Sequence, residues 1–127
     1  MAARTFDTLI ASYPPEIQSL ARDARSFLRG LLPDADEAID ASAPYAFYSY
    51  GPGYRGVVCN LMISKTGVKI GLAQGSTLAD PRGLLRGSGK VHRHVPLESS
   101  SDLRTPGLKA LVRAAHTAWR TRSSKGD

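Results

Sequence analysis

The chain is poor in the residues that build covalently or metal-held frameworks. It contains one cysteine, Cys59, among 127 residues. A single cysteine cannot close an intrachain disulfide, and without a cysteine cluster the sequence has no pattern for structural zinc. A domain of this length buries enough surface to fold without either. We therefore expect a fold that rests on a hydrophobic core.

Long hydrophobic runs are also missing. The longest apolar stretch, Val57 to Ile63, is interrupted by Asn60 and is far shorter than the ~18 residues of a membrane helix. No continuous apolar block follows Arg4, so the sequence shows no signal peptide. The 42% hydrophobic and 22% charged residues are ordinary for a globular protein. We expect a soluble, cytoplasmic protein with no membrane partner.

Lysine is absent from the first half of the chain, and the charge is unevenly divided. Residues 1–64 carry five arginines against seven acidic residues, a net charge of −2. Residues 65–127 carry twelve basic against four acidic residues, a net charge of +8. This asymmetry favours an anionic partner for the second half, such as phosphate, nucleotide or nucleic acid. It is equally typical of a surface that only keeps a protein soluble.

Helical spacing of apolar residues predicts helices at both ends of the chain. A short helix near Phe6 is followed, after Pro14 and Pro15, by one that ends before Pro33. The last helix is expected to have Thr105 as its N-cap and Pro106 as its first residue. Its apolar stripe consists of Leu108, Leu111, Val112, Ala115 and Trp119, which predicts that Trp119 is buried, and a basic stripe beside it consists of Lys109, Arg113, His116 and Arg120.

The middle of the chain alternates with the period of strands. Val57 to Ser64 and Val68 to Ala73 are predicted to form a hairpin, with further strands at Tyr45 to Tyr50 and Val91 to Leu97. The predicted fold is an α+β domain: an antiparallel sheet of about four to five strands, covered by N-terminal helices and a C-terminal helix. We expect one domain over residues 1–122, followed by a disordered tail at residues 123–127.

The segment Gly75 to Leu97 carries a family resemblance. Its sequence, GSTLADPRGLLRGSGKVHRHVPL, resembles the G-x-x-L-x-D-P-x-G-L-L-x-G-x-G-K-x-x-R-H-V-x-L pattern of the YdhG-like family of small bacterial domains of unknown function. The matching residues are Gly75, Leu78, Asp80, Pro81, Gly83, Leu84, Leu85, Gly87, Gly89, Lys90, Arg93, His94, Val95 and Leu97. Weaker likeness extends to both flanks, and the resemblance implies a compact α+β fold.

Some members of that family are described as frataxin-like iron chaperones, which gives a first alternative function. Such a role needs clustered acidic residues, because hard cations prefer oxygen ligands. The nearest candidates are Asp34, Asp36, Glu37 and Asp40, which are more typical of a solvent-facing loop. Where relatives have a Tyr-Gly-Met-Pro-like turn, this chain has Ala43-Pro44-Tyr45, and this difference argues against iron.

No catalytic signature is present. Gly87-Ser88-Gly89-Lys90 is not a P-loop, because Leu84 and Val91 stand where glycine and Ser or Thr are needed. Its glycines suit a tight turn, whose amides beside Lys90 could hold an anion. Cys59 lies among apolar residues and is expected to be a packing residue. We predict that the protein is not an enzyme and needs no cofactor.

The residues expected to bind a ligand lie on two predicted strands. Lys90, His92 and His94 share one strand face, while Tyr48 and Tyr50 share a face of another. Together they predict a site for a small anionic ligand; core packing of the tyrosines and structural roles for the histidines are the alternatives. Arg93 is expected to face inward and to pair with an acid such as Asp80. A nucleic-acid accessory role is the second alternative function.

Overall fold

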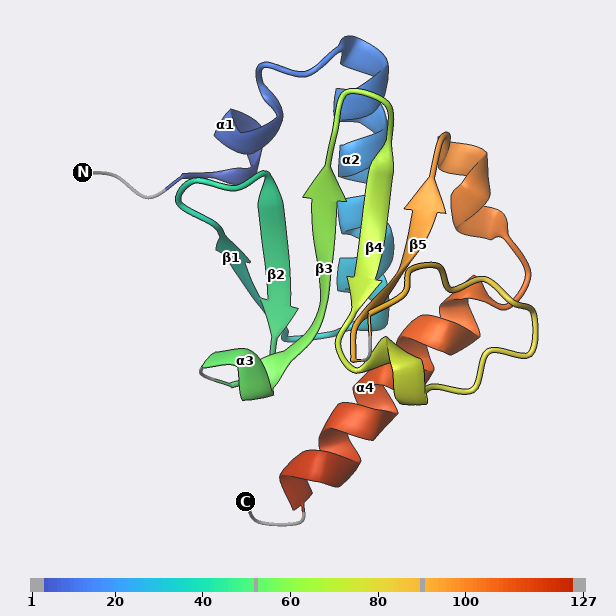
Figure 1. Cartoon of the computed structure of the whole chain (residues 1–127). Helices are drawn as coiled ribbons and strands as arrows, with labels where there is room; N and C mark the ends of the chain where they lie inside the picture. Colours follow the sequence, from blue (N-terminus) through green and yellow to red (C-terminus); the bar gives the residue numbers. More distant parts are fainter. Residues whose placement is uncertain (1–3, 52, 90, 125–127) are drawn as a thin grey trace.

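The computed structural model describes residues 4–51, 53–89 and 91–124. A five-stranded antiparallel sheet in the order β1-β2-β3-β4-β5 confirms the predicted α+β fold (Figure 1). The elements, in chain order, are α1 (Phe6–Ile10), α2 (Pro15–Leu31), β1 (Asp36–Ile39), β2 (Tyr45–Ser49), α3 (Gly53–Gly56), β3 (Val57–Ile63), β4 (Val68–Leu72), the 3-10 helix η1 (Gly75–Thr77), β5 (Arg93–Leu97), the 3-10 helix η2 (Ser100–Arg104) and α4 (Leu108–Ser124).

The hairpin β3–β4 matches its prediction. Leu61 pairs with Ile70 and Ile63 with Val68, so the apolar residues of the two alternating segments lie on one face. The turn closes where the Ser64 amide donates a hydrogen bond to the Gly67 carbonyl at 2.9 Å. The strand period in the sequence therefore located both strands and their pairing.

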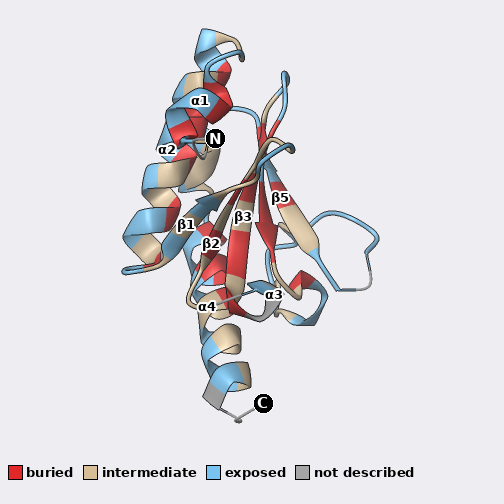
Figure 2. Cartoon of the chain, turned by 90° about the vertical axis from the view of Figure 1, so that its left-hand side faces the viewer, coloured by how far each residue is buried: buried red, intermediate tan, exposed pale blue. Residues whose placement is uncertain are grey.

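One face of the sheet, the covered face, carries the hydrophobic core. Helices α2 and α4 both contact β3, and in Figure 2 the buried residues concentrate where α1 and α2 lie against the sheet. The core residues of the sheet include Ala46, Tyr48, Cys59, Leu61 and Ile70, and those of the long helices include Leu20, Ala24, Leu28, Leu108 and Val112. Continuous apolar stripes on both long helices explain why they lie on this face.

Strand β1 forms where the sequence analysis placed acidic residues on a loop. The carboxylate of Glu37 in β1 accepts two hydrogen bonds from Arg25 of α2, both at 2.7 Å, and one from the Tyr48 hydroxyl at 2.8 Å. Arg25 also lies over the Phe6 ring, 4.8 Å from its centroid. These contacts fasten the edge strand to α2, so Arg25 is a packing residue and not part of a solvated face.

The last helix begins two residues later than predicted. Gly107 has a φ of +93°, a conformation that suits glycine and excludes a helical start at Pro106. Trp119 is partly buried and packs against the edge of the core, which is less burial than its stripe predicted. Helix α4 includes residues 123 and 124, and the rest of the predicted tail, residues 125–127, lies outside the described residues.

Strand β5 begins at Arg93, two residues later than predicted. The ring of His92 accepts a hydrogen bond at its Nδ1 atom from the Gln74 amide at 3.2 Å, and Val91 is 48% exposed. The predicted strand is therefore wrong over Val91 and His92, which belong to a loop before Arg93 and show no strand alternation.

Candidate functional site

The other face of the sheet, the uncovered face, carries a row of aligned residues from four strands. Phe47 pairs with Asn60, Asn60 with Gly71, and Gly71 with His94. Since directly paired residues share a face, these four residues form one line across β2, β3, β4 and β5. The row alternates with the buried residues of the covered face, so its side chains point away from α2 and α4.

A pocket of about 360 Å³ lies over this row. Its lining consists of Phe47, Val57, Asn60, Met62, Gly71, Leu72, Ala73, His92, Arg93 and His94. The end over β2 and β3 is mostly apolar, whereas the end at β5 is lined by two histidines and an arginine. No acidic residue is among these lining residues, so the pocket combines an apolar wall with a wall of basic residues.

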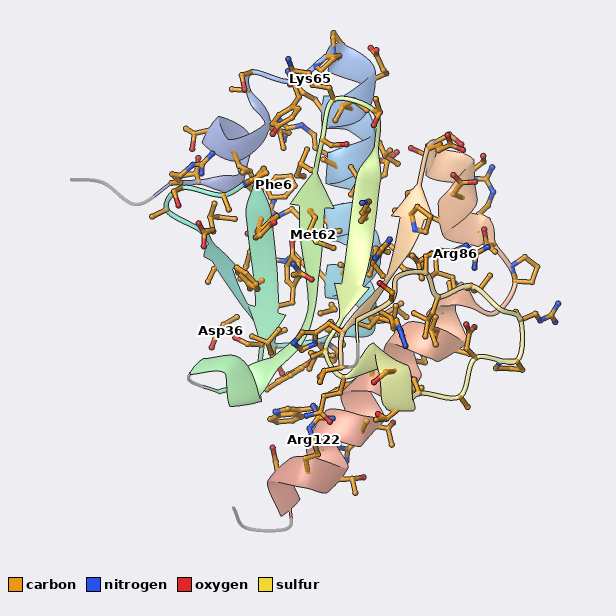
Figure 3. All side chains as sticks on the ribbon, viewed as in Figure 1. Phe6, Asp36, Met62, Lys65, Arg86 and Arg122 are labelled. Atoms are coloured by element: carbon orange, nitrogen blue, oxygen red, sulfur yellow. The ribbon has the colours of Figure 1, made fainter. Side chains whose placement is uncertain are left out.

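The floor of the pocket depends on Gly71. A Cβ atom at this position would overlap the side-chain oxygen of Asn60 and would lie 3.1 Å from Cε of Met62. The side chains of Asn60 and Met62 therefore lie over the glycine, on the face that is turned to the viewer in Figure 3, where Met62 is labelled. Glycine at position 71 leaves room for a polar amide at the centre of an otherwise apolar floor.

His94 stands at the charged end of the pocket. Its backbone exchanges two hydrogen bonds with Arg86, at 2.7 and 3.1 Å, and its ring packs against Gly87. Burial lowers the pKa of His94, and the charges of Lys69 and Arg86 lower it further. A cationic environment that disfavours the imidazolium is one in which a bound anion would be stabilised.

Arg93 has a different partner from the one predicted. Its Nη1 atom donates to the Gly87 carbonyl at 3.1 Å, and its Cβ lies against Gly75. The Asp80 carboxylate instead binds backbone amides. Its two oxygens accept hydrogen bonds from the amides of Leu84 and Leu85, each at 2.9 Å. The predicted Arg93–Asp80 pair is therefore absent from the described contacts, because Asp80 closes its own turn.

The glycine-rich segment that carries the family resemblance has a structural explanation. Gly83 and Gly87 have φ values of +63° and +108°, which disfavour every other residue type. The segment is held to the pocket end of β5 by the pair of Arg86 with His94 and by the Ser76 amide, which donates to the Val91 carbonyl at 3.0 Å. These contacts hold the segment beside His92, Arg93 and His94, which line the basic end of the pocket.

The five residues predicted to bind a ligand are not all brought together. His92 and His94 line the pocket, while Lys90 lies outside the described residues. Tyr48 is buried on the covered face, so its placement beside the histidines is wrong. Tyr50 stacks on His116 at a centroid distance of 4.6 Å and does not line the pocket either.

The register between β2 and β3 explains why Tyr48 does not lie beside the histidines. Tyr48 pairs with Cys59, a core residue, and the register shifts between Tyr48 and Ser49. Phe47 is the aromatic residue of β2 that lines the pocket, and it was not among the predicted ligand-binding residues. The polar Asn60 in β3 indicated a face that is not a core face, but the pairing that puts Phe47 on this face is a property of the folded sheet.

The acidic residues proposed as metal ligands do not converge. Asp40 accepts backbone hydrogen bonds from Ser42 and Ala43 at 2.9 and 2.7 Å, and Glu37 is held by Arg25. Within the described part of the chain, no three His, Cys, Asp or Glu side chains form a group that could hold a metal ion.

Comparisons with known proteins give no indication of the function. No protein-family model, no curated protein and no solved structure matches the chain. Among the described residues, no helix is both long enough and apolar enough to cross a membrane.

Proposed function

We propose that the chain is a YdhG-like, cytoplasmic, small-ligand-binding domain, and that its ligand is an anion with an apolar part. The ligand would lie in the pocket on the uncovered face. Its apolar part would contact Phe47 and Met62, and its anionic group would lie near His94 and Arg93. Ligand pockets are typically apolar with a few convergent polar groups, and this pocket has that composition.

The observation that carries the proposal is the charge of one wall. Arg93 and His94 line the pocket, and Lys69 and Arg86 are near enough to His94 to influence its pKa. A positively charged wall without an acidic lining residue selects against cations and favours anions. The apolar wall opposite adds affinity only for ligands that have a hydrophobic portion.

The proposal is binding and not catalysis. The pocket lining contains no serine, cysteine or acid that could serve as a nucleophile or as a carboxylate base. Cys59 is buried on the covered face, and burial raises the pKa of its thiol, which disfavours the reactive thiolate. Nδ1 of His92 is engaged with the Gln74 amide, which supports a positioning role for that ring.

The test is a charge change at the pocket floor. Asn60→Asp keeps the shape of the side chain and places a negative charge over Gly71, beside the proposed position of the anionic group. Benzoate, phenyl phosphate and the neutral benzyl alcohol are suitable probes, with binding followed by titration calorimetry and by the shift in melting temperature. We expect the two anions to stabilise the parent protein and to lose at least about tenfold in affinity for Asn60→Asp, which corresponds to ~1.4 kcal/mol.

The matched control is Ser26→Glu, which adds the same charge on the exposed surface of α2. This variant should bind both anions like the parent protein. If the two anions and benzyl alcohol raised the melting temperature equally, or if Asn60→Asp and Ser26→Glu behaved alike, the anion-binding pocket would be refuted.

A further inference from the structure

Helix α4 carries a row of basic residues that the proposed pocket does not use. Lys109, Arg113, His116 and Arg120 follow one another at intervals of four, three and four residues. At ~100° per residue these positions lie within about 60° of one another around the helix, and from Lys109 to Arg120 they span about 16 Å. Lys109, Arg113 and Arg120 are exposed, and His116 is partly buried. We call these four residues the α4 basic row.

The positive charge of this row is not neutralised locally. Helix α4 contains no Asp or Glu in its 17 residues. Within the described ranges, the ion pairs of the chain join Arg22, Arg25 and Arg29 to acids of the first half, and none involves the α4 basic row. Most exposed cations of a globular protein have acids nearby, so an unneutralised row on one helix favours a polyanionic partner.

Aromatic rings lie beside the row. His116 stacks on Tyr50 at a centroid distance of 4.6 Å and an interplanar angle of 3°, and Trp119 stacks on Tyr50 at 5.1 Å. The Tyr50 hydroxyl donates to the Pro33 carbonyl at 2.7 Å, which anchors the stack to the end of α2. A rigid group of rings next to unpaired cations is the arrangement with which proteins hold single-stranded nucleic acid.

We propose that the α4 basic row, with the rings of Tyr50 and Trp119 at its side, binds single-stranded nucleic acid. The cations contact successive phosphates, and the rings offer a stacking surface to a base. An anionic membrane fits this surface less well, because the apolar stripe of α4, including Leu108, Leu111 and Val112, is already buried in the core and cannot insert into lipid. The site is separate from the pocket and does not depend on its ligand.

The experiment uses fluorescence anisotropy with labelled oligonucleotides of about 12 nucleotides, a length in the range that such surfaces cover. The full chain is titrated over a series of salt concentrations. With three phosphate contacts, the logarithm of the affinity should fall with the logarithm of salt with a slope of about −2. The double variant Arg113→Gln/Arg120→Gln should bind about tenfold more weakly and should lose about 1.4 of that slope.

The matched control is Lys65→Gln/Lys69→Gln, which removes the same charge from the β3–β4 hairpin. Both lysines are exposed, and Lys69 lies on the uncovered face near the pocket. This control should bind the oligonucleotide like the parent protein. If the two double variants lost affinity equally, binding would follow net charge or the pocket face, and the proposal would be overturned.

Trp119 is the only tryptophan in the chain and reports on the stacking surface. Oligonucleotide binding should quench its fluorescence, whereas inorganic polyphosphate, which has no bases, should not. Equal affinity and equal quenching for both polyanions would overturn the nucleic-acid assignment, as would preferential binding to vesicles rich in phosphatidylserine. Melting curves of all variants check that the fold is retained, which the exposure of Arg113 and Arg120 leads us to expect.

Discussion

The two faces of the sheet differ in what their residues accomplish. The covered face carries large apolar side chains such as Leu61 and Ile70, both fully buried under helices. At the paired positions one residue away, the uncovered face carries Asn60 and Gly71. A polar amide over a glycine contributes little to a core. The uncovered face therefore contributes less packing energy than the covered face and leaves room for a pocket. Stability and ligand binding are thereby assigned to opposite faces of the same strands.

The largest expected effect is a difference in the free energy of unfolding between variants of two neighbouring residues of β4. Ile70 is buried on the covered face, and Lys69 is exposed on the other face. Ile70→Ala should lower the free energy of unfolding by about 3 kcal/mol, because it removes buried methyl groups and leaves a cavity. Lys69→Gln should change it by less than about 0.5 kcal/mol. Urea denaturation of both variants measures the contrast, and similar values would contradict the assignment of the faces.

A smaller effect is expected from two tyrosines of β2. The hydroxyl of Tyr48 donates to Glu37, whereas Tyr45 is on the uncovered face, and within the described residues its hydroxyl makes no hydrogen bond. Tyr48→Phe should cost about 1.5 kcal/mol, as expected for a hydrogen bond to a charged group. Tyr45→Phe should cost less than about 0.5 kcal/mol, so an equal loss in the two variants would contradict this difference.

The pH dependence of stability has a contribution from each face. On the covered face, burial alone would raise the pKa of Glu37, but the hydrogen bonds from Arg25 and Tyr48 and the charges of Arg25 and Arg29 outweigh it and lower the pKa below its ordinary 4.5. A lowered carboxyl pKa gives stability that is fully present above pH 4.5 and is lost as the pH falls through the folded-state value. Glu37→Gln should make the free energy of unfolding depend less on pH below pH 4.5, which unfolding experiments at several pH values would measure.

On the uncovered face, His94 also makes the protein less stable as the pH falls, but in a higher pH range. Burial and the neighbouring charges of Lys69 and Arg86 lower the pKa of His94 below its ordinary 6.5. The unfolded chain therefore takes up a proton first, and stability decreases as the pH falls below 6.5. The pKa of His116 is also lowered, by burial and by the charge of Arg120, so His94→Gln should remove only part of this decrease, and it should leave the pH dependence below pH 4.5 unchanged. A variant that altered the pH dependence in both ranges would show that the two faces are coupled.

For Gly71→Ala we expect a modest effect on stability and a large effect on binding. In Gly71→Ala the new methyl group must displace the Asn60 side chain, which can rotate into the pocket at a cost of about 1 kcal/mol. The core on the other face is untouched. We expect benzoate and phenyl phosphate to lose most of their affinity in this variant, measured by calorimetry, and unchanged binding would contradict the role of Gly71 as the pocket floor.

The strands with clear alternation could be predicted from the sequence, and the edge strand β1 could not. In β3 and β4 every second residue is large and apolar, so period and turn together specified the pairing. Strand β1 has only four residues, and its inward position is occupied by Glu37. In the sequence, a glutamate that faces inward because it pairs with Arg25 cannot be distinguished from a glutamate on a loop. Only the tertiary contact with α2 distinguishes them.

Only part of the pocket could be predicted from the sequence. The positions of His94 and Val95 on opposite faces followed from alternation, and the structure places both as expected. The faces of Phe47 and Tyr48 could not be decided, because adjacent aromatic residues satisfy a core and a surface equally well. The choice depended on the register with β3, including the shift between Tyr48 and Ser49, and register is a long-range property.

The pairing of Arg86 with His94 along β5 also bears on how the chain behaves at high concentration. An outer strand with free backbone groups is a template on which another molecule's strand can assemble. At β5 part of that template is already occupied, because the Arg86 backbone pairs with His94. At the opposite edge, β1 is only four residues long and begins with two acids, Asp36 and Glu37. Both edges therefore resist strand-to-strand association, and the pocket's charged wall also protects the sheet against aggregation.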